Sequence, residues 1–152
     1  MGNDCGVCEQ PTAIKVKVKL LPGGKMPYKA TLGAACYDLY AADNAAIKPG
    51  EQTTIGFGVC MEIPPGYEGQ IRPRSGMTFK GAWEAFGTID SDYRGEIKGT
   101  IINHSKQELL INRGDRIAQL AIREVPTIEF VEVDELSDTE RGCGGFGSTG
   151  VK

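Results

Sequence analysis

Short alternating segments separated by glycine and proline turns run through this 152-residue chain, and no stretch keeps helical periodicity for three turns. Between residues 14 and 20, aliphatic side chains alternate with lysines, which is the period-2 pattern of a strand with one wet face. The same alternation returns over 55–63, where a Pro-Pro-Gly turn ends it. Further strands are expected near 96–103, 109–112, 116–123 and 128–133. Many short strands between such turns predict an all-β sandwich or barrel.

The chain is organised as one domain with two ends of different composition. Its best helical candidate is Gly76–Ala85, where Ser75 is placed to cap the first turn. Neither an internal repeat nor a linker interrupts the middle of the sequence. We therefore expect a flexible leader over residues 1–12, a β-barrel domain over 13–134 and a C-terminal arm over 135–152.

Charge and hydropathy narrow the range of partners. The formal net charge of −3 provides no basic footprint for polymeric nucleic acid, whereas several arginines lie in glycine-rich segments that suit a small anionic ligand. No apolar run approaches the ~18 residues of a membrane span, and no signal peptide is visible. We expect a cytoplasmic protein that binds neither nucleic acid nor a membrane.

The five cysteines indicate the same compartment. Cys5 and Cys8 form a C-x-x-C pair, a spacing compatible with zinc or redox chemistry. No second pair accompanies them, and the single histidine, His104, lies in a turn-like Asn-His-Ser segment. The cysteines are therefore interpreted as reduced thiols of a cytosolic protein.

The segment Arg141–Gly150 has a composition of its own. Half of its residues are glycine, so it cannot hold a structure alone, yet it carries a cation, an aromatic ring and two hydroxyls. Converging backbone N–H groups and an arginine bind phosphate, and a ring such as that of Phe146 can lie on a base. The segment is interpreted as a lid over a nucleotide; the alternative is a disordered tail.

Two carboxylates and one loop are further candidates. Asp90 lies in Gly87–Gly95, beside a predicted hairpin tip, and could act as a general base; a turn-shaping role is the alternative. Asp38 interrupts an apolar strand, where a lone carboxylate is costly unless paired, so a salt bridge to an arginine is at least as good an explanation as catalysis. The loop Arg72–Gly76 suits a phosphate, and an ordinary loop is the alternative.

Five segments, taken in order, resemble the five motifs of the trimeric deoxyuridine triphosphate nucleotidohydrolases (dUTPases). They are Ala34–Tyr40, Pro73–Gly76, Gly87–Gly95, Arg113–Leu120 and Arg141–Gly150. The resemblance covers the chain from residue 13 onward. It implies a jelly-roll-like β barrel assembled as a homotrimer, with active sites shared between chains and an arm that crosses to a neighbour.

The resemblance also implies hydrolysis of dUTP to dUMP and pyrophosphate, which supplies the dTMP precursor and keeps uracil out of DNA. Asp90 would be the general base for a water molecule that attacks the alpha phosphorus. Tyr93 would stack under the deoxyribose and exclude a 2′-hydroxyl. The backbone that binds uracil would come from Gly87, Thr88, Ile89 and Lys98.

The remaining implied contacts are to the triphosphate and its metal. Those to the alpha and beta phosphates would come from Arg74, Ser75, Gly76 and Gln119. The arm would place Arg141, Gly147 and Ser148 on the gamma phosphate and Phe146 over the uracil ring. Mg²⁺ would be chelated by the three phosphates, with Asp38 touching it only through water.

The chain departs from the family pattern at two thiols, since Cys36 replaces a glycine in the first motif and Cys143 a small residue in the arm. Both could make the site sensitive to oxidation. The segment Met77–Phe86 varies among relatives, so the resemblance assigns no base contact to Glu84. Two alternatives stay open: a dCTP deaminase or bifunctional deaminase–diphosphatase on the same barrel, and a jelly-roll binding module without catalysis.

Overall fold

The computed structural model describes residues 13–145, and this part of the chain forms eleven β-strands and one helix of five residues. In chain order the elements are β1 (Lys17–Leu20), β2 (Tyr37–Tyr40), β3 (Ala45–Ile47), β4 (Gln52–Gly56), β5 (Val59–Glu62), β6 (Tyr67–Pro73), α1 (Ser75–Phe79), β7 (Ala82–Glu84), β8 (Gly87–Ile89), β9 (Lys98–Asn103), β10 (Leu109–Ile111) and β11 (Arg116–Glu124). The predicted all-β fold is confirmed. Within the same residues, no helix has the length and apolar character needed to cross a membrane.

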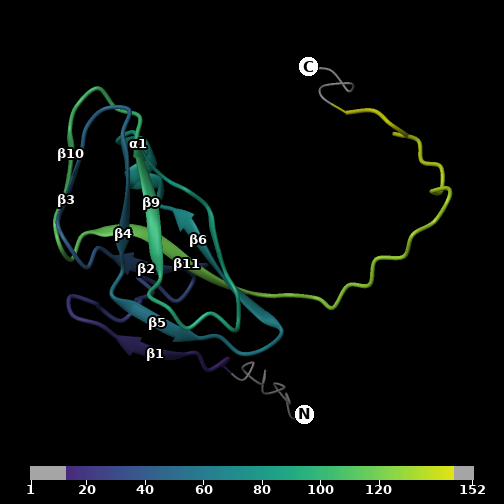
Figure 1. Ribbon diagram of the computed structural model, residues 1–152, viewed down its shortest axis with the longest axis horizontal. Coiled ribbons are helices and arrows are strands. Elements are labelled where there is room, and N and C mark those ends of the chain that lie inside the picture. The colour runs from purple at the N-terminus through teal and green to yellow at the C-terminus, as the bar shows by residue number, and fades with distance from the viewer. Residues whose placement is uncertain (1–12, 146–152) are drawn as a thin grey trace, which may run out of the picture.

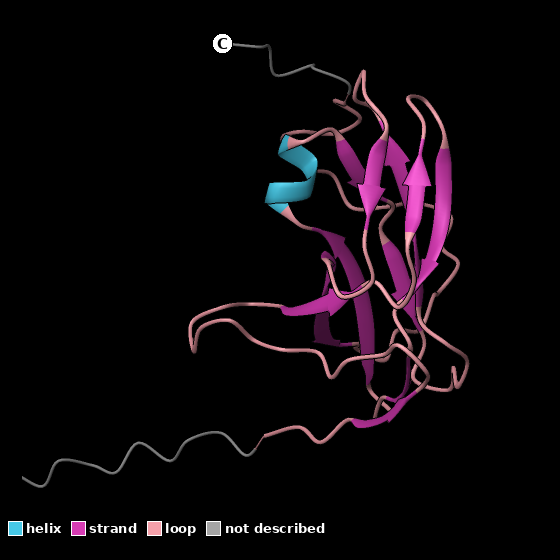
Figure 2. Ribbon diagram, turned by 90° about the vertical axis from the view of Figure 1, so that its left-hand side faces the viewer, coloured by secondary structure: helices cyan, strands magenta, loops and turns pink. Residues whose placement is uncertain are grey.

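Two antiparallel sheets and two antiparallel ribbons make up the fold (Figure 1, Figure 2). The larger sheet has the strand order β2-β11-β6-β8, and the second sheet has the order β4-β9-β7. The ribbons are β1-β5 and β3-β10. Each strand is followed in the chain by a strand of another sheet or ribbon, so the chain crosses repeatedly between layers, as in a jelly roll.

Aliphatic and aromatic side chains from the sheets and ribbons fill the interior. Leu39 of β2, Ile101 of β9 and Ile117 of β11 are each 1% exposed, and Phe57, between β4 and β5, is equally buried. Burial of one such side chain contributes roughly 1.5–3 kcal/mol relative to exposure. Disulfides do not contribute to stability within residues 13–145, because the cysteines there are free thiols: Cys36, Cys60 and Cys143.

The turns form where glycine and proline predict them. After the Pro-Pro-Gly segment, the Tyr67 N–H donates to the Pro64 carbonyl at 3.2 Å. Before β11, the Asp115 N–H donates to the Asn112 carbonyl at 2.9 Å, and Gly114 between them has a φ of 89°. A left-handed φ of this kind strains residues that carry a Cβ, which explains the glycine.

The single strand predicted over 55–63 is wrong, because the chain breaks at Gly58 into β4 and β5. Gly58 has a φ of 64°, and Gly24 packs so closely against it that a Cβ on either glycine would overlap the other's backbone. The Leu21 N–H also donates to the Gly58 carbonyl at 2.8 Å. The break lets β4 pair with β9 while β5 turns away to pair with β1.

Two further element predictions are corrected. The helix expected over 76–85 spans only Ser75–Phe79, and its N-cap is Arg74 rather than Ser75, with no side-chain capping bond. Ala82–Glu84 instead forms β7, because the edge of β9 supplies hydrogen bonds to this stretch. The strand expected over 128–133 does not form, because no described strand lies beside this exposed stretch to pair with it (Figure 1).

Candidate active site

A hollow of about 830 Å³ lies where the start of α1 meets β2, β11 and the end of β6. Ligand pockets commonly have volumes of roughly 300–1,000 Å³. The lining includes the predicted phosphate contacts Arg74, Ser75, Gly76 and Gln119, together with Cys36, Asp38, Arg72 and Arg116. The fold therefore brings together three motif-like segments that are distant in the sequence: 34–40, 73–76 and 113–120.

Asp38 is paired with two arginines in this hollow. Its Oδ1 lies 2.9 Å from Arg74 Nε, and its Oδ2 accepts a hydrogen bond from Arg116 Nη1 at 3.2 Å. Asp38 is 9% exposed, whereas the Arg116 side chain is 51% exposed, so screening by water weakens the Arg116 contact more than the Arg74 contact. The salt-bridge explanation for Asp38 is confirmed.

Arg74 is oriented from two sides. Besides its Nε contact to Asp38, its Nη1 donates to the Arg116 carbonyl at 2.8 Å. A guanidinium has five N–H donors, so others remain for an anion in the hollow. Gln119 supports the same loop, because its Nε2 donates to the Pro73 carbonyl at 2.8 Å. The next residues, Ser75 and Gly76, are exposed, and their N–H groups begin α1 without intrahelical acceptors.

Asp90 and Tyr93 lie in a second region, outside the lining of the hollow. The Asp90 carbonyl accepts a hydrogen bond from the Tyr93 N–H at 3.1 Å, which closes a turn directly after β8. The Tyr93 hydroxyl donates to the Glu96 carbonyl at 3.0 Å, and its ring lies over Gly95, where a Cβ would overlap it. Both Asp90 and Tyr93 are exposed, so their side chains are accessible to a ligand.

The prediction of a hairpin at Gly87–Gly95 is wrong, because the strands on either side of this segment do not pair with each other. β8 pairs with β6, whereas β9 pairs with β4 and β7, so the strands that flank Asp90 belong to different sheets. Among the described strands, β8 therefore has one unpaired edge. Lys98 and Gly99 at the start of β9 also lie beyond the β7 pairing, which ends at Ile101. The backbone here keeps donors and acceptors that a ligand can use.

The strand β6 sets the separation between the two regions. β8 lies opposite Gly69–Ile71, and Arg74 follows the far end of β6. Asp90, which follows β8, is therefore about level with Glu68, six residues before Arg74. At about 3.3 Å per residue, this places Asp90 and Arg74 roughly 20 Å apart. One chain thus contains both sets of predicted residues but does not bring them together.

The predicted arm contacts are not brought to either region within the described residues. Arg141 is exposed and absent from the lining of the hollow, and its Nε donates to the Gly144 carbonyl at 2.8 Å. Figure 1 shows that the chain leads away from the sheets after β11. The other predicted arm contacts, Phe146, Gly147 and Ser148, lie outside the described residues, as do Cys5 and Cys8.

Glu84 is a buried carboxyl group that sequence reasoning left without a role. It is 4% exposed, and neither carboxyl oxygen has a hydrogen-bond partner within residues 13–145. Desolvation by burial raises the pKa of Glu84 from 4.5 to about 8. The sequence contains the same signal for Glu84 as for Asp38. Each is a lone carboxylate within an apolar run, which for Glu84 is Ala82–Phe86.

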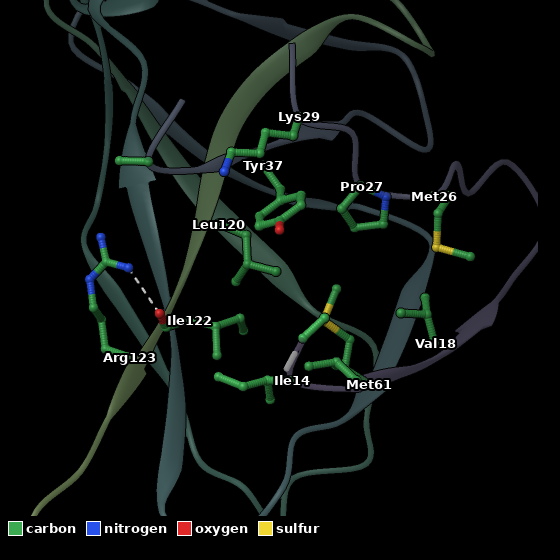
Figure 3. A pocket seen from close by; sticks show the side chains of 13 residues that line it. Ile14, Val18, Met26, Pro27, Lys29, Tyr37, Met61, Leu120, Ile122 and Arg123 are labelled. Atoms are coloured by element: carbon green, nitrogen blue, oxygen red, sulfur yellow. Dashed lines mark hydrogen bonds between the residues drawn. The ribbon is translucent and has the colours of Figure 1, made fainter. Parts of the chain in front are cut away.

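A second cavity, of about 470 Å³, lies over β1, β2, β5 and β11 and is mostly apolar (Figure 3). Its charged lining residues are Lys29 and Arg123. Arg123 Nη1 donates to the Ile122 carbonyl at 2.9 Å, and Lys29 Nζ lies 5.8 Å from the centre of the Tyr37 ring. Because no carboxylate lines this cavity, it does not offer a general base for phosphate chemistry.

The positions of the carboxylates in the described residues determine how a metal ion could be bound. Among residues 13–145, no group of three or more His, Cys, Asp and Glu side chains could hold a metal ion. In the hollow, both oxygens of Asp38 already contact guanidinium groups. This donor set fits a metal that arrives on the phosphates of a ligand and is touched through water, as Mg²⁺ commonly is.

The fold and the hollow define the class as an all-β protein of antiparallel sheets with an arginine-lined hollow. A family model described as dUTPase matches residues 23–150, so the chain belongs to the dUTPase family of nucleotidohydrolases. The deoxyuridine 5′-triphosphate nucleotidohydrolase of Nautilia profundicola is 52% identical over 141 residues, covering 90% of this chain and 99% of the relative. That of a Hydrogenobaculum species is 48% identical over 138 residues, covering 88% and 96%.

Solved structures agree with this assignment. A mutant dUTPase of Staphylococcus bacteriophage 80alpha with dUpNHpp has a TM-score of 0.82 at 31% identity, covering 90% of this chain and 99% of the phage chain. A mutant dUTPase from phage phi11 of S. aureus, described for the coordination of a structural Mg(II) ion, has a TM-score of 0.77 at 28% identity, covering 82% and 99%. The family resemblance seen in the sequence is confirmed.

Proposed function

We propose that this protein hydrolyses dUTP to dUMP and pyrophosphate, which supplies the dTMP precursor and keeps uracil out of DNA. Membership of the dUTPase family supports this activity. The observation that carries the proposal is the orientation of Arg74, whose guanidinium is fixed by Asp38 and the Arg116 carbonyl beside Ser75 and Gly76. A fixed cation next to free backbone N–H groups suits a phosphate chain.

The hollow binds the alpha and beta phosphates in this proposal. Arg74 donates to their oxygens, and the Ser75 hydroxyl and the N–H groups of Ser75 and Gly76 complete the contacts. Gln119 keeps the loop in place through its 2.8 Å bond to Pro73, and its amide faces the same hollow. The arm over 135–152 adds Arg141, Gly147 and Ser148 at the gamma phosphate and Phe146 over the base.

Asp90 acts as the general base. Its carboxylate takes a proton from a water molecule whose oxygen forms a bond to the alpha phosphorus. The bond from that phosphorus to the bridging oxygen breaks, and pyrophosphate leaves with the electron pair. A positioned base contributes roughly 10²- to 10⁴-fold to the rate. The accessible Asp90 carboxylate, on a turn closed by the 3.1 Å backbone bond, supports this role.

Tyr93 selects the sugar. Its hydroxyl bond to the Glu96 carbonyl and the close approach of its ring to Gly95 fix the ring against the loop. The deoxyribose stacks on this ring, and a 2′-hydroxyl would collide with it. The free strand edges at Gly87, Thr88, Ile89 and Lys98 bind uracil, because strand edges present alternating donors and acceptors.

Magnesium, when bound to the substrate phosphates, supplies charge neutralisation at the reacting phosphorus. Asp38 would contact the bound ion only through a water molecule. The pairing of Asp38 with Arg74 and Arg116 supports this outer role, since both of its oxygens already contact guanidinium groups.

The active site is shared between chains of a homotrimer. Asp90 and Arg74 are roughly 20 Å apart in one chain, which is too far for both to act on one triphosphate. A second chain that brings its Asp90 region to this hollow would complete the site, and the arm would close over it. We place the reaction in the cytoplasm, where reduced thiols persist; the free Cys36 in the hollow is compatible with that location.

Pyrophosphate release from dUTP, dCTP, dTTP and UTP with magnesium tests the proposal. We expect turnover of dUTP and little of the others. Cytosine would leave polar groups of the site unpaired, the 2′-hydroxyl of UTP would collide with Tyr93, and the 5-methyl group of thymine would need extra space beside the base. Asp90→Asn is the matched control and should bind dUTP yet lose roughly 10²- to 10⁴-fold in kcat. Equal turnover of dUTP and dTTP would contradict the proposal, and ammonia release from dCTP would indicate a deaminase instead.

A further inference from the structure

Glu96 is a half-buried residue of the second region to which the proposed function gives no role. It lies between the turn at Asp90 and the start of β9, and its side chain is 28% exposed. Its carboxylate Oε1 accepts a hydrogen bond from the Gly58 N–H at 3.1 Å. Its backbone carbonyl accepts the Tyr93 hydroxyl at 3.0 Å. One residue therefore connects the Tyr93 ring to the break between β4 and β5.

The chain opposite Glu96 has the shape that this carboxylate needs. A Cβ on Gly56 would overlap Oε1 of Glu96, so glycine at this position leaves the space that the carboxylate occupies. Gly58 has a φ of 64°, a backbone conformation that strains residues with a Cβ, and its N–H donates to the carboxylate. Glycine in or beside a strand often marks a close approach of this kind. The Glu96 side chain is therefore positioned by backbone atoms rather than by another mobile side chain.

The backbone after Glu96 provides one anchor for its carbonyl, and the side chain provides a second. The Ile97 N–H, in the same peptide group as the Glu96 carbonyl, donates to the Val59 carbonyl at 2.8 Å. A peptide group held by one hydrogen bond can still tilt about that bond. The bond from the Gly58 N–H to the Glu96 carboxylate restricts this tilt, because it fixes the residue that carries the carbonyl. Supporting hydrogen bonds of this kind give a binding group its defined position.

We infer that Glu96 is a positioning residue for sugar selection, because its carboxylate fixes the carbonyl that holds the Tyr93 ring in place. The inference rests on the proposed function, in which that ring excludes the 2′-hydroxyl. Exclusion by contact works only if the ring does not yield. A ring whose hydroxyl acceptor can move would be able to swing away from Gly95 and admit the ribose of UTP.

Recognition of the base does not depend on this carboxylate. Glu96 Oε2 lies 3.7 Å from Lys98 Nζ, but the Lys98 side chain is 55% exposed, so water screens this contact. The proposed function uses the backbone of Lys98 for uracil, and that backbone is held by its pairing with Gly56 in β4. Loss of the Glu96 carboxylate should therefore affect sugar preference and leave base preference nearly unchanged.

Steady-state kinetics of the full chain test the inference with two measured quantities. Sugar preference is the ratio of kcat/KM for dUTP to that for UTP, and base preference is the ratio of the dCTP inhibition constant to the dUTP KM. In Glu96→Ala, sugar preference should fall by roughly threefold to tenfold, which is the contribution of one hydrogen bond, and base preference should change by less than about twofold.

Two matched variants separate the hydrogen bond from the charge. Glu96→Gln keeps a side-chain oxygen that can accept from the Gly58 N–H but removes the charge near Lys98, so it should retain the sugar preference of the parent. Glu62→Ala also removes a carboxylate, which here forms an exposed 3.1 Å pair with Lys17 on the β1–β5 ribbon. It should change neither preference.

Tyr93→Phe tests the other end of the same connection. It keeps the ring that stacks on the sugar but removes the hydroxyl that bonds to the Glu96 carbonyl, so it should lower sugar preference by a factor similar to that of Glu96→Ala. Combining the two changes should lower it by less than about twofold more, because both release the same ring. If the thermal midpoint shows that Glu96→Ala does not fold, Tyr93→Phe still decides, since an unchanged preference in this variant overturns the inference.

Four results would count against the role of Glu96. They are parental sugar preference in Glu96→Ala, equal losses of sugar and base preference in that variant, an equal loss in Glu96→Gln, and fully additive losses in the double variant. The second would indicate a general loosening of the site, and the third an effect of charge. A parent that does not hydrolyse dUTP would instead refute the proposed function, so the two failures are distinguishable.

Discussion

The separation of Asp90 from Arg74 predicts that two inactive variants will restore each other's activity. The register of β6 and β8 places these residues roughly 20 Å apart in one chain. In a homotrimer, a complete site would take Asp90 from one chain and Arg74 from another. Asp90→Asn and Arg74→Ala should each inactivate the protein alone, whereas mixed trimers should contain complete sites.

The expected size of the rescue follows from the fraction of sites in which both contributing residues are intact. When equal amounts of the two variants assemble at random, half of the chains keep Asp90 and the other half keep Arg74. A site is complete when both of its donors are intact, which happens in about one quarter of sites in a closed symmetric trimer. Because Asp90→Asn retains at most about 1% of the activity, the mixture should exceed that parent by roughly 25-fold or more.

Pyrophosphate release after dissociation, mixing and reassembly provides the assay. Parental chains carried through the same treatment set the yield and the background, and native mass spectrometry measures the fraction of mixed trimers. The Arg74→Ala chain keeps the Asp38–Arg116 pair and is therefore expected to fold. Its thermal unfolding midpoint, measured before mixing, checks this. Mixed trimers with no more activity than the two parents would refute the shared site.

Two further predictions concern Tyr93 and Glu84. Tyr93→Ala should reduce the preference for dUTP over UTP, measured as the ratio of kcat/KM values, because it removes the ring that excludes a 2′-hydroxyl; an unchanged ratio would reject that role. The pKa of Glu84 in the folded state is about 8, above its ordinary value of 4.5. Between these two pH values the folded state binds one proton more than the unfolded state. The free energy of unfolding should therefore fall as the pH rises from 4.5 to 8. Urea unfolding at about pH 5 and pH 8 should show up to about 1.4 kcal/mol of loss per pH unit in the parent but not in Glu84→Gln, and equal slopes would contradict the buried neutral acid.

Local sequence signals predicted the parts of the fold that depend on neighbouring residues. The alternation over residues 14–20 predicted β1, because Val16 and Val18 pack against the core while the lysines between and beside them remain in water. The turn around Gly114 was predictable because its left-handed backbone favours glycine wherever the rest of the chain lies. Asp38 was also marked as a carboxylate that needs a partner, since the cost of burying a charge is local.

The tertiary structure decided the features that depend on distant partners. Gly58 breaks a strand that the alternation predicted as continuous, because Gly24 approaches it from elsewhere in the chain. Ala82–Glu84 has a strand conformation because β9 offers it an edge, whereas 128–133 has the alternation of a strand but no described partner.

The candidate site shows the same division. Chemical type and local spacing marked Asp38, Asp90 and the loop Arg72–Gly76 as candidates, and the family resemblance added Tyr93. The sequence could not show that Asp38 pairs with Arg74 and Arg116, or that Asp90 lies at the other end of β6, because pairing register joins residues that are far apart in sequence. Burial likewise exists only once the sheets have packed, so the raised pKa of Glu84 is a property of the tertiary structure alone.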